Sequence, residues 1–130
     1  IIQQPDDRER FTDIKTLAEP NDVLLWQAAA SKVGVKAEVV KYIQAIVKET
    51  RKTDEVLLGA STRAGMGLFR SARAYAFLRG RDYVLPDDVK LLAPHLLTHR
   101  LWLHSAATNG TRDVEIDNLV ARMVDSVPLP

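Results

Sequence analysis

Residues 61–81 contain five arginines, at positions 63, 70, 73, 79 and 81, and no lysine or acidic residue. Arg63 follows Ser61 and Thr62, whose side chains suit the N-terminal cap of a helix, so it falls in the first turn of a helix expected over residues 63–79. A cation in a first turn opposes the helix macrodipole, at a cost of about 0.3–1 kcal/mol, unless an anion lies beside it. The free N–H groups of that turn and a guanidinium together suit a phosphate. Arg63 is therefore either a phosphate ligand or an ordinary cation that is solvated or paired with a carboxylate.

The expected helix over residues 63–79 is amphipathic and positions Arg63. Its apolar residues recur at intervals of three and four. This spacing predicts a buried stripe of Leu68, Phe69, Ala72, Tyr75 and Ala76. Arg63, Arg70 and Arg73 cluster on another side of the helix, and Gly80 suits the residue that ends it. The helix thus has one face for packing and one basic face.

Four short segments follow one another along the chain: Gly59-Ala60-Ser61-Thr62-Arg63-Ala64, Gly80-Arg81-Asp82-Tyr83-Val84, Pro86-Asp87-Asp88-Val89 and His99-Arg100. Together they resemble the C-terminal lid of MoxR-type AAA+ ATPases, a family that usually writes these segments as GASPRA, GRDYV, PDDV and HR. The chain departs from that pattern at Thr62, where proline is usual, and at Leu85, where a capping threonine or serine is usual.

The resemblance implies a role for each residue of the first segment. In the family, the arginine of GASPRA is the sensor 2 residue, which reaches the γ-phosphate of ATP held by the core domain of the same chain. The matching residue is Arg63, which the resemblance therefore makes a catalytic residue. It also implies that Gly59, Ala60 and Ser61 belong to the nucleotide-binding turn, and it implies no metal ligand in this chain.

The resemblance further implies a domain organisation and a function. Residues 1–20 would be the end of the AAA+ core and its connection to the lid, and residues 21–130 would be the helical lid with its C-terminal helix. The lid would couple binding and hydrolysis of ATP, with Mg²⁺, to chaperone-like maturation or assembly of other proteins, often ones with von Willebrand factor A domains. Its other partners would be its own core domain and the neighbouring subunits of a ring oligomer.

The composition of the chain and the motifs that it lacks limit the functions it can have. A length of 130 residues suits one domain, and a formal net charge of +1 gives no overall attraction to nucleic acid. The lack of cysteine agrees with a cytoplasmic location, and no apolar run approaches the roughly 20 residues of a membrane span. The chain begins on Ile1 and Ile2 and looks like a fragment of a longer protein. It has no GxxxxGK[ST] loop and no Walker B acidic pair, so we expect ATP hydrolysis only in the full-length protein and none by these residues alone.

The periodicity predicts an all-α fold, a small bundle of about four principal helices with short flanking ones. The expected helices cover 6–17, a stretch capped by Asn21 or Asp22 and ending near Lys32, 36–51, 63–79, a stretch from Pro86 that breaks near Ala93 and resumes to about Leu101, and 113–126. Residues 56–58 are expected to be extended, and Asn109-Gly110 suggests a hairpin turn.

Several residues admit a second interpretation. The basic helix 63–81 would alternatively make the chain an independent nucleic-acid-binding module, although it lacks Lys, Asn and Gln for base contacts. Arg70 and Arg73 could contact a nucleotide or a neighbouring subunit, or form only an exposed basic face. His95, His99 and His104 have a spacing that zinc could use, but we favour packing or capping roles for His95 and His99. Trp26 and Trp102 are expected in the core or at a domain interface, and Arg81 is expected to pair with Asp82.

Overall fold

The computed structural model describes residues 15–104 and 112–130, and this part of the chain is mainly helical. Its α-helices are α1 (Pro20–Ala30), α2 (Ala37–Glu49), α3 (Thr62–Leu78), α4 (Pro86–Leu97) and α5 (Arg112–Ser126). A 3-10 helix, η2 (Thr98–Arg100), extends α4, and β1 (Val56–Leu58) pairs antiparallel with β2 (Trp102–Leu103). The predicted all-α bundle is confirmed, with this short ladder as its only sheet among the described residues.

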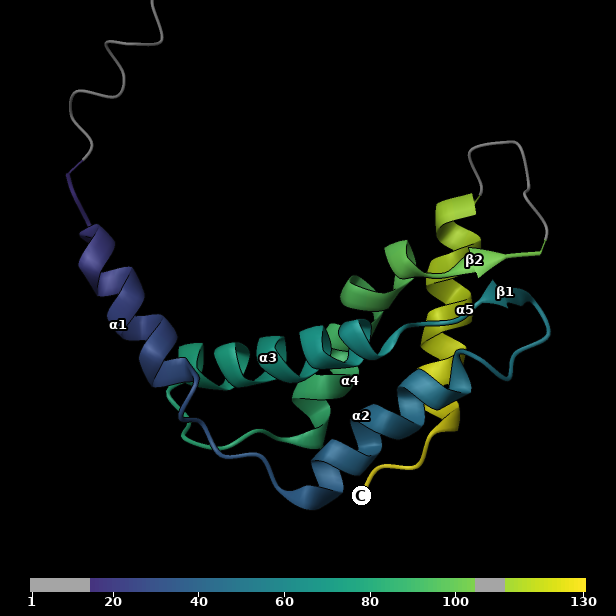
Figure 1. The fold of residues 1–130 in the computed structure, drawn as a ribbon, viewed down its shortest axis with the longest axis horizontal. Helices are drawn as coiled ribbons and strands as arrows, with labels where there is room; N and C mark the ends of the chain where they lie inside the picture. Colours follow the sequence, from purple (N-terminus) through teal and green to yellow (C-terminus); the bar gives the residue numbers. More distant parts are fainter. Residues whose placement is uncertain (1–14, 105–111) are drawn as a thin grey trace, which may run out of the picture.

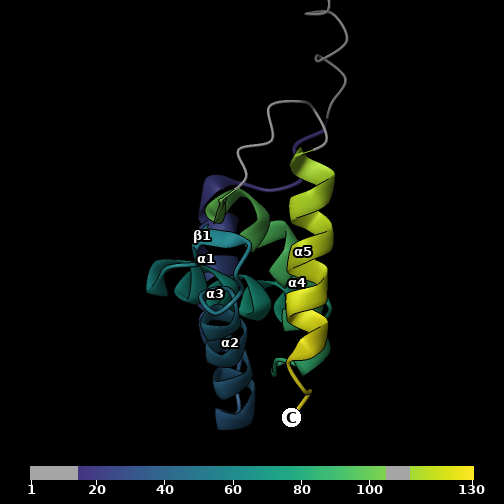
Figure 2. The same cartoon turned by 90° about the vertical axis from the view of Figure 1, so that its right-hand side faces the viewer.

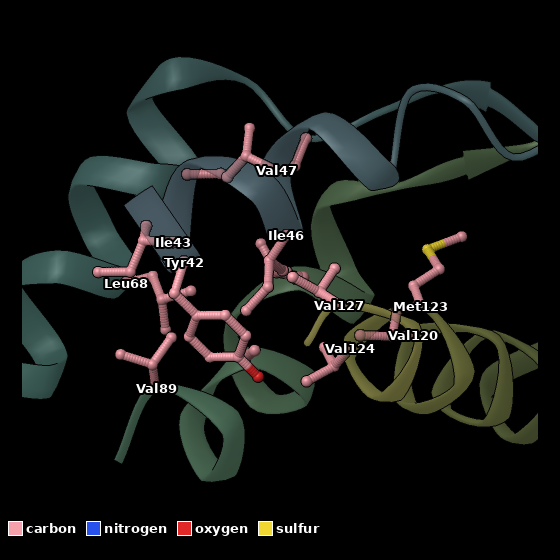
Figure 3. Packing of buried hydrophobic residues seen from close by; sticks show 14 of the residues in the cluster. Tyr42, Ile43, Ile46, Val47, Leu68, Val89, Val120, Met123, Val124 and Val127 are labelled. Atoms are coloured by element: carbon pink, nitrogen blue, oxygen red, sulfur yellow. The ribbon is translucent and has the colours of Figure 1, made fainter. Parts of the chain in front are cut away.

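Helices α2 to α5 form the packed part of the molecule. Helix α3 lies across α2 and against α4, and α5 closes the end of the bundle beside α4 and η2 (Figures 1 and 2). The side chains that meet in the core include Ile46, Leu68, Val89 and Val120, none of which is exposed (Figure 3). They come from four different helices, because each helix carries apolar residues at intervals of three and four.

The predicted buried stripe of α3 is mostly confirmed. In α3, Leu68, Ala72 and Ala76 are buried, whereas Phe69 and Tyr75 are only half-buried. Ala64 is also buried and extends the stripe to the start of the helix. Its neighbour Arg63 is exposed.

Helix α1 differs from the other four because none of its residues is buried. It contacts α3, and Figure 1 shows it leaning away from the rest of the bundle. Leu24, Leu25 and Trp26 are 61%, 59% and 49% exposed, so this helix presents apolar side chains to solvent. Trp102 is also exposed. The prediction that these two tryptophans lie in a core is wrong for this domain, and an interface with another domain stays a prediction.

Two predicted helix boundaries are wrong. Helix α1 begins at Pro20 rather than after Asn21 or Asp22: Pro20 suits a first helical position, and the Asp22 carboxylate accepts a hydrogen bond from the Glu19 N–H at 2.8 Å. Helix α4 continues through Pro94. The lost backbone donor is outweighed there by Val89, Ala93 and Leu97, which pack both halves of the helix into the core.

Two other predicted elements are not tested. The helix expected over 6–17 and the hairpin at Asn109-Gly110 fall largely or wholly outside the described residues, and residues 15–17 are not helical. No helix in the described ranges is both long and apolar enough to cross a membrane.

Candidate functional site

The turn before α3 is fastened to the end of α2. Gly59 lies so close to α2 that a Cβ atom there would sit 2.7 Å from the Thr50 carbonyl oxygen. The Ala60 N–H donates to Thr50 Oγ1 at 2.9 Å, and Arg51 Nε donates to the Ala60 carbonyl at 3.0 Å. Thr50 and Ala60 have no exposed surface. The start of α3 is therefore fixed by contacts that only a glycine and a small residue permit.

Ser61 caps α3, as predicted. Its Oγ accepts a hydrogen bond from the Ala64 N–H at 3.3 Å, and its backbone is extended. Thr62 is the first helical residue rather than a second cap. The N–H groups of Thr62 and Arg63 donate to no acceptor in the described residues. They are free to meet an anion at the helix start.

Arg63 extends from this first turn into a hollow of about 540 Å³. We call it the arginine hollow, and define it by the residues that line it: Thr62, Arg63, Met66, Gly67, Arg70 and Arg100. Arg63 and Arg70 are exposed and share this hollow. Arg73 does not, because its guanidinium lies over the Phe69 ring, 5.4 Å from the centroid. The predicted basic face of α3 is therefore divided.

The four residues predicted to bind nucleotide are neighbours in space as well as in sequence, but they differ in what they offer. Ala60 has both backbone polar groups engaged within the chain. Gly59 makes the close approach to α2, and Ser61 caps the helix. Arg63 alone among the four has an exposed charged group. The geometry can thus present one guanidinium and the first-turn N–H groups to a phosphate.

A second charged group organises the turn between α3 and α4. Arg81 binds Asp88 through two hydrogen bonds, of 2.8 and 2.6 Å, and Asp88 is only 4% exposed. The predicted Arg81–Asp82 pair is wrong, because Asp88 offers a buried carboxylate with fixed geometry, whereas Asp82 is exposed. Burial alone would raise the pKa of Asp88, but the hydrogen bonds from Arg81 and from the Leu85 N–H hold that pKa below its usual value.

Asp88 also explains how α4 begins without a capping hydroxyl. Leu85, at the cap position, cannot accept a hydrogen bond with its side chain, but its N–H donates to Asp88 Oδ2 at 2.8 Å. In the same turn, Gly80 has a φ of +71°, a left-handed conformation that favours glycine just after the end of a helix such as α3. The turn is also tied to the segment before α2, because the Gly34 N–H donates to the Asp82 carbonyl at 2.7 Å.

The packing role predicted for His95 and His99 is wrong, whereas the capping role stays a prediction. His95 and His99 are exposed, and Nε2 of His99 accepts a hydrogen bond from Arg100 Nε at 3.2 Å. Among the described residues no three potential metal ligands lie together. The sequence did not predict that Arg100 approaches α3. The only feature that drew attention to Arg100 was the His99-Arg100 segment of the family resemblance.

Sequence comparison with known proteins identifies the family of this domain. Residues 48–119 match the AAA lid domain family. The chain is 35% identical over 127 residues to the uncharacterised protein YeaC of Bacillus subtilis, covering 95% of this chain and 39% of YeaC. It is 35% identical over 125 residues to the chaperone MoxR1 of Mycobacterium tuberculosis, covering 89% of this chain and 33% of MoxR1.

One solved structure extends the comparison to three dimensions. The crystal structure of a candidate ATPase from Cytophaga hutchinsonii superposes with a TM-score of 0.76 at 29% identity, over 95% of this chain and 41% of that one. The chain thus spans only a third to two fifths of the length of these relatives. The family match covers the turn, α3, the Arg81–Asp88 pair and Arg100. The chain belongs to the AAA lid domain family and is a lid of the MoxR type.

Proposed function

We propose that this chain is the sensor 2 lid of a MoxR-like AAA+ ATPase. Arg63 contacts the γ-phosphate of ATP that is held by the core domain of the same protein. The observation that carries this proposal is the position of Arg63. It extends from the first turn of α3, is exposed, and has no carboxylate within ion-pair distance among the described residues.

The site residues act together in this proposal. Gly59 and Ala60 fix the start of α3 against α2, and Ser61 caps the helix. Arg63 then supplies a planar guanidinium to the charge that develops on the terminal phosphate as its bond to ADP breaks. The two free first-turn N–H groups add a positive potential at the same place. The described residues that line the arginine hollow include no carboxylate, so Mg²⁺ would be held by the core and the nucleotide.

The lid couples this contact to movement. A bridge between ATP in the core and Arg63 in the lid exists only while the γ-phosphate is present, so hydrolysis releases the lid. Exposed apolar side chains on α1, at the end of the bundle, suit contact with the core. In a ring of such subunits, located in the cytoplasm, this cycle would drive chaperone-like maturation of other proteins. The name of the relative chaperone MoxR1 supports that role.

The test compares the full-length ATPase that carries this chain with residues 1–130 alone. We expect the full-length protein to hydrolyse ATP in the presence of Mg²⁺. We expect the 130-residue chain to fold as a helical domain and to release no phosphate above a heat-treated control, because it has no phosphate-cradling loop. A full-length protein that neither binds nor hydrolyses ATP would overturn the proposal, as would turnover by the lid alone.

A further inference from the structure

We propose that Arg100 and Arg70 join Arg63 in a single anion site, which holds the γ-phosphate of bound ATP. This inference rests on the proposed function and extends it to two residues. Arg70 lies on α3 and Arg100 ends η2, so the site is assembled from two elements that are far apart in the sequence.

The geometry brings the three arginines to one hollow. Arg63, Gly67 and Arg70 are spaced i, i+4 and i+7, so they share one face of α3. A Cβ atom on Gly67 would lie 3.7 Å from Nη1 of Arg100, so the Arg100 guanidinium approaches α3 at Gly67, which lies between Arg63 and Arg70 in the sequence. All four residues line the arginine hollow.

The β1–β2 ladder fixes this arrangement. Strand β2 begins two residues after Arg100, and β1 ends just before Gly59. The two strands pair at Val56 with Leu103 and at Leu58 with Trp102. Buried Leu101 anchors the chain between Arg100 and β2. The ladder therefore holds the segment that carries Arg100 beside the segment that leads into α3.

The charges in the hollow are unbalanced. The ion pairs among the described residues, Lys52–Glu49, Arg81–Asp88, Lys90–Asp125 and Arg122–Glu55, all lie elsewhere. The other arginines of the basic helix have partners: Arg73 lies over Phe69, Arg79 lies over Tyr75, and Arg81 binds Asp88. Arg100 donates through Nε to His99, and its terminal nitrogens donate to no acceptor among residues 15–104 and 112–130. Three like charges that share a hollow repel one another unless an anion joins them.

Gly67 adds a second reason to expect a ligand. A helix is less stable with glycine than with alanine at an interior position, so the presence of Gly67 needs another explanation. A long side chain at this position would enter the space between the guanidinium groups. Glycine leaves the hollow open.

The chemistry of the hollow favours a terminal phosphate. A terminal phosphate has three oxygens and carries close to two charges, so it can accept from more than one guanidinium fork, whereas a carboxylate has only two oxygens. The free N–H groups at the start of α3 lie at the same end of the hollow. A nucleoside triphosphate and inorganic triphosphate both have such a terminal group, whereas each phosphodiester of a nucleic-acid backbone has only two non-bridging oxygens and one negative charge.

The experiment measures the affinity of the full-length protein for a non-hydrolysable ATP analogue and for ADP. The variants are Arg63→Ala, Arg70→Ala, Arg100→Ala and Gly67→Leu. Arg79→Ala is the matched control, because it removes the same charge from the residue that caps the C-terminus of α3, outside the hollow. For Arg100→Ala we expect about a tenfold loss of affinity for the analogue, the size of one charge-assisted hydrogen-bonding group, and less than a twofold change for ADP.

The remaining variants refine the assignment. Arg70→Ala should act in the same direction as Arg100→Ala. Gly67→Leu keeps all three charges but fills the hollow, so it should weaken the analogue about as much as Arg100→Ala. Arg100→Lys keeps the charge and loses the planar fork, so it should recover only part of the affinity. The control should bind both nucleotides like the wild type.

The outcomes separate this inference from the proposed function. Wild-type affinity in Arg100→Ala, with a loss in Arg63→Ala, overturns the three-arginine site and leaves the sensor 2 proposal standing. Wild-type affinity in both variants overturns both proposals. A loss of affinity for ADP equal to the loss for the ATP analogue overturns the assignment to the γ-phosphate, because ADP has no γ-phosphate.

We expect inorganic triphosphate, but not duplex DNA, to compete with the ATP analogue for the site. DNA binding that depends on Arg100, with nucleotide binding unaffected, would assign the hollow to a nucleic acid instead. Thermal melting of each variant confirms that it is folded.

Discussion

At the scale of single residues, Asp88 is the charged group on which the domain depends most. It accepts two hydrogen bonds from Arg81 and one from the Leu85 N–H, and it is almost fully buried. We expect Asp88→Asn to lower the free energy of unfolding by about 1–2 kcal/mol, because it weakens two charge-assisted bonds of a pair that is partly open to solvent on the Arg81 side. Chemical denaturation at pH 7 measures this loss.

The pKa of Asp88 gives the same contribution a pH dependence. Its folded value is below the ordinary 3.8, so the ionised carboxylate favours the folded state. The stabilisation is fully present above pH 3.8 and is lost as the pH falls through the lower, folded value. The difference between wild type and Asp88→Asn should therefore shrink in acid. A difference that stayed constant from pH 7 to pH 2 would show that the charge of Asp88 is not what stabilises the turn.

Gly59 is the residue whose replacement should most disturb the start of α3. A Cβ there would lie 2.7 Å from the Thr50 carbonyl oxygen and 2.6 Å from Arg51 Cγ. We expect Gly59→Ala to destabilise the domain by about 1–3 kcal/mol, because backbone atoms must move apart. Gly67→Ala is the matched control: its added methyl meets only ordinary contact, and alanine is the better helix former, so stability should stay equal or rise. Equal denaturation midpoints for the two variants would contradict this account.

At the scale of elements, the arginines of α3 and of the turn that follows it fall into two groups. Arg63 and Arg70 line the hollow, whereas Arg73, Arg79 and Arg81 contact Phe69, Tyr75 and Asp88, respectively. An uninterrupted basic helix, as the nucleic-acid alternative requires, is therefore not available. We expect duplex DNA to bind only weakly, in the micromolar range or above at physiological salt, and without sequence preference. Titration of labelled duplexes checks this, and submicromolar binding with a clear preference would refute it.

The sequence predicted most elements, but not the exceptions that depend on packing. The periodicity of α3 indicated most of its buried face, because amphipathic spacing follows directly from helix geometry. The break at Pro94 was wrong, since the local rule against proline inside a helix cannot include the burial of Val89, Ala93 and Leu97. The Arg81–Asp82 pair was wrong for the same reason: adjacency in sequence is visible, whereas the position of Asp88 one turn into α4 depends on how the chain folds back.

At the scale of the whole molecule, the candidate site was only partly predictable. The cap at Ser61 and the exposed Arg63 followed from the residues near the helix start and are present. The position of the Arg100 side chain near Gly67 was not predicted, because it depends on the β1–β2 pairing between distant segments. The exposure of α1 is also a tertiary property: its apolar residues read as a helix in the sequence, yet the described residues provide no core for them.

The proposed contact between Arg63 and the γ-phosphate of ATP is tested most directly by one substitution. Because Arg63 is exposed, Arg63→Ala should leave the thermal midpoint unchanged. A positioned arginine finger can contribute about 10³–10⁵ in rate. A sensor acts partly through lid closure, so we expect ATP affinity and turnover of the full-length protein to fall by a combined factor on the order of 10–100. Arg63→Lys should recover little, because an ammonium lacks the planar fork. Wild-type affinity and hydrolysis in Arg63→Ala would contradict the account.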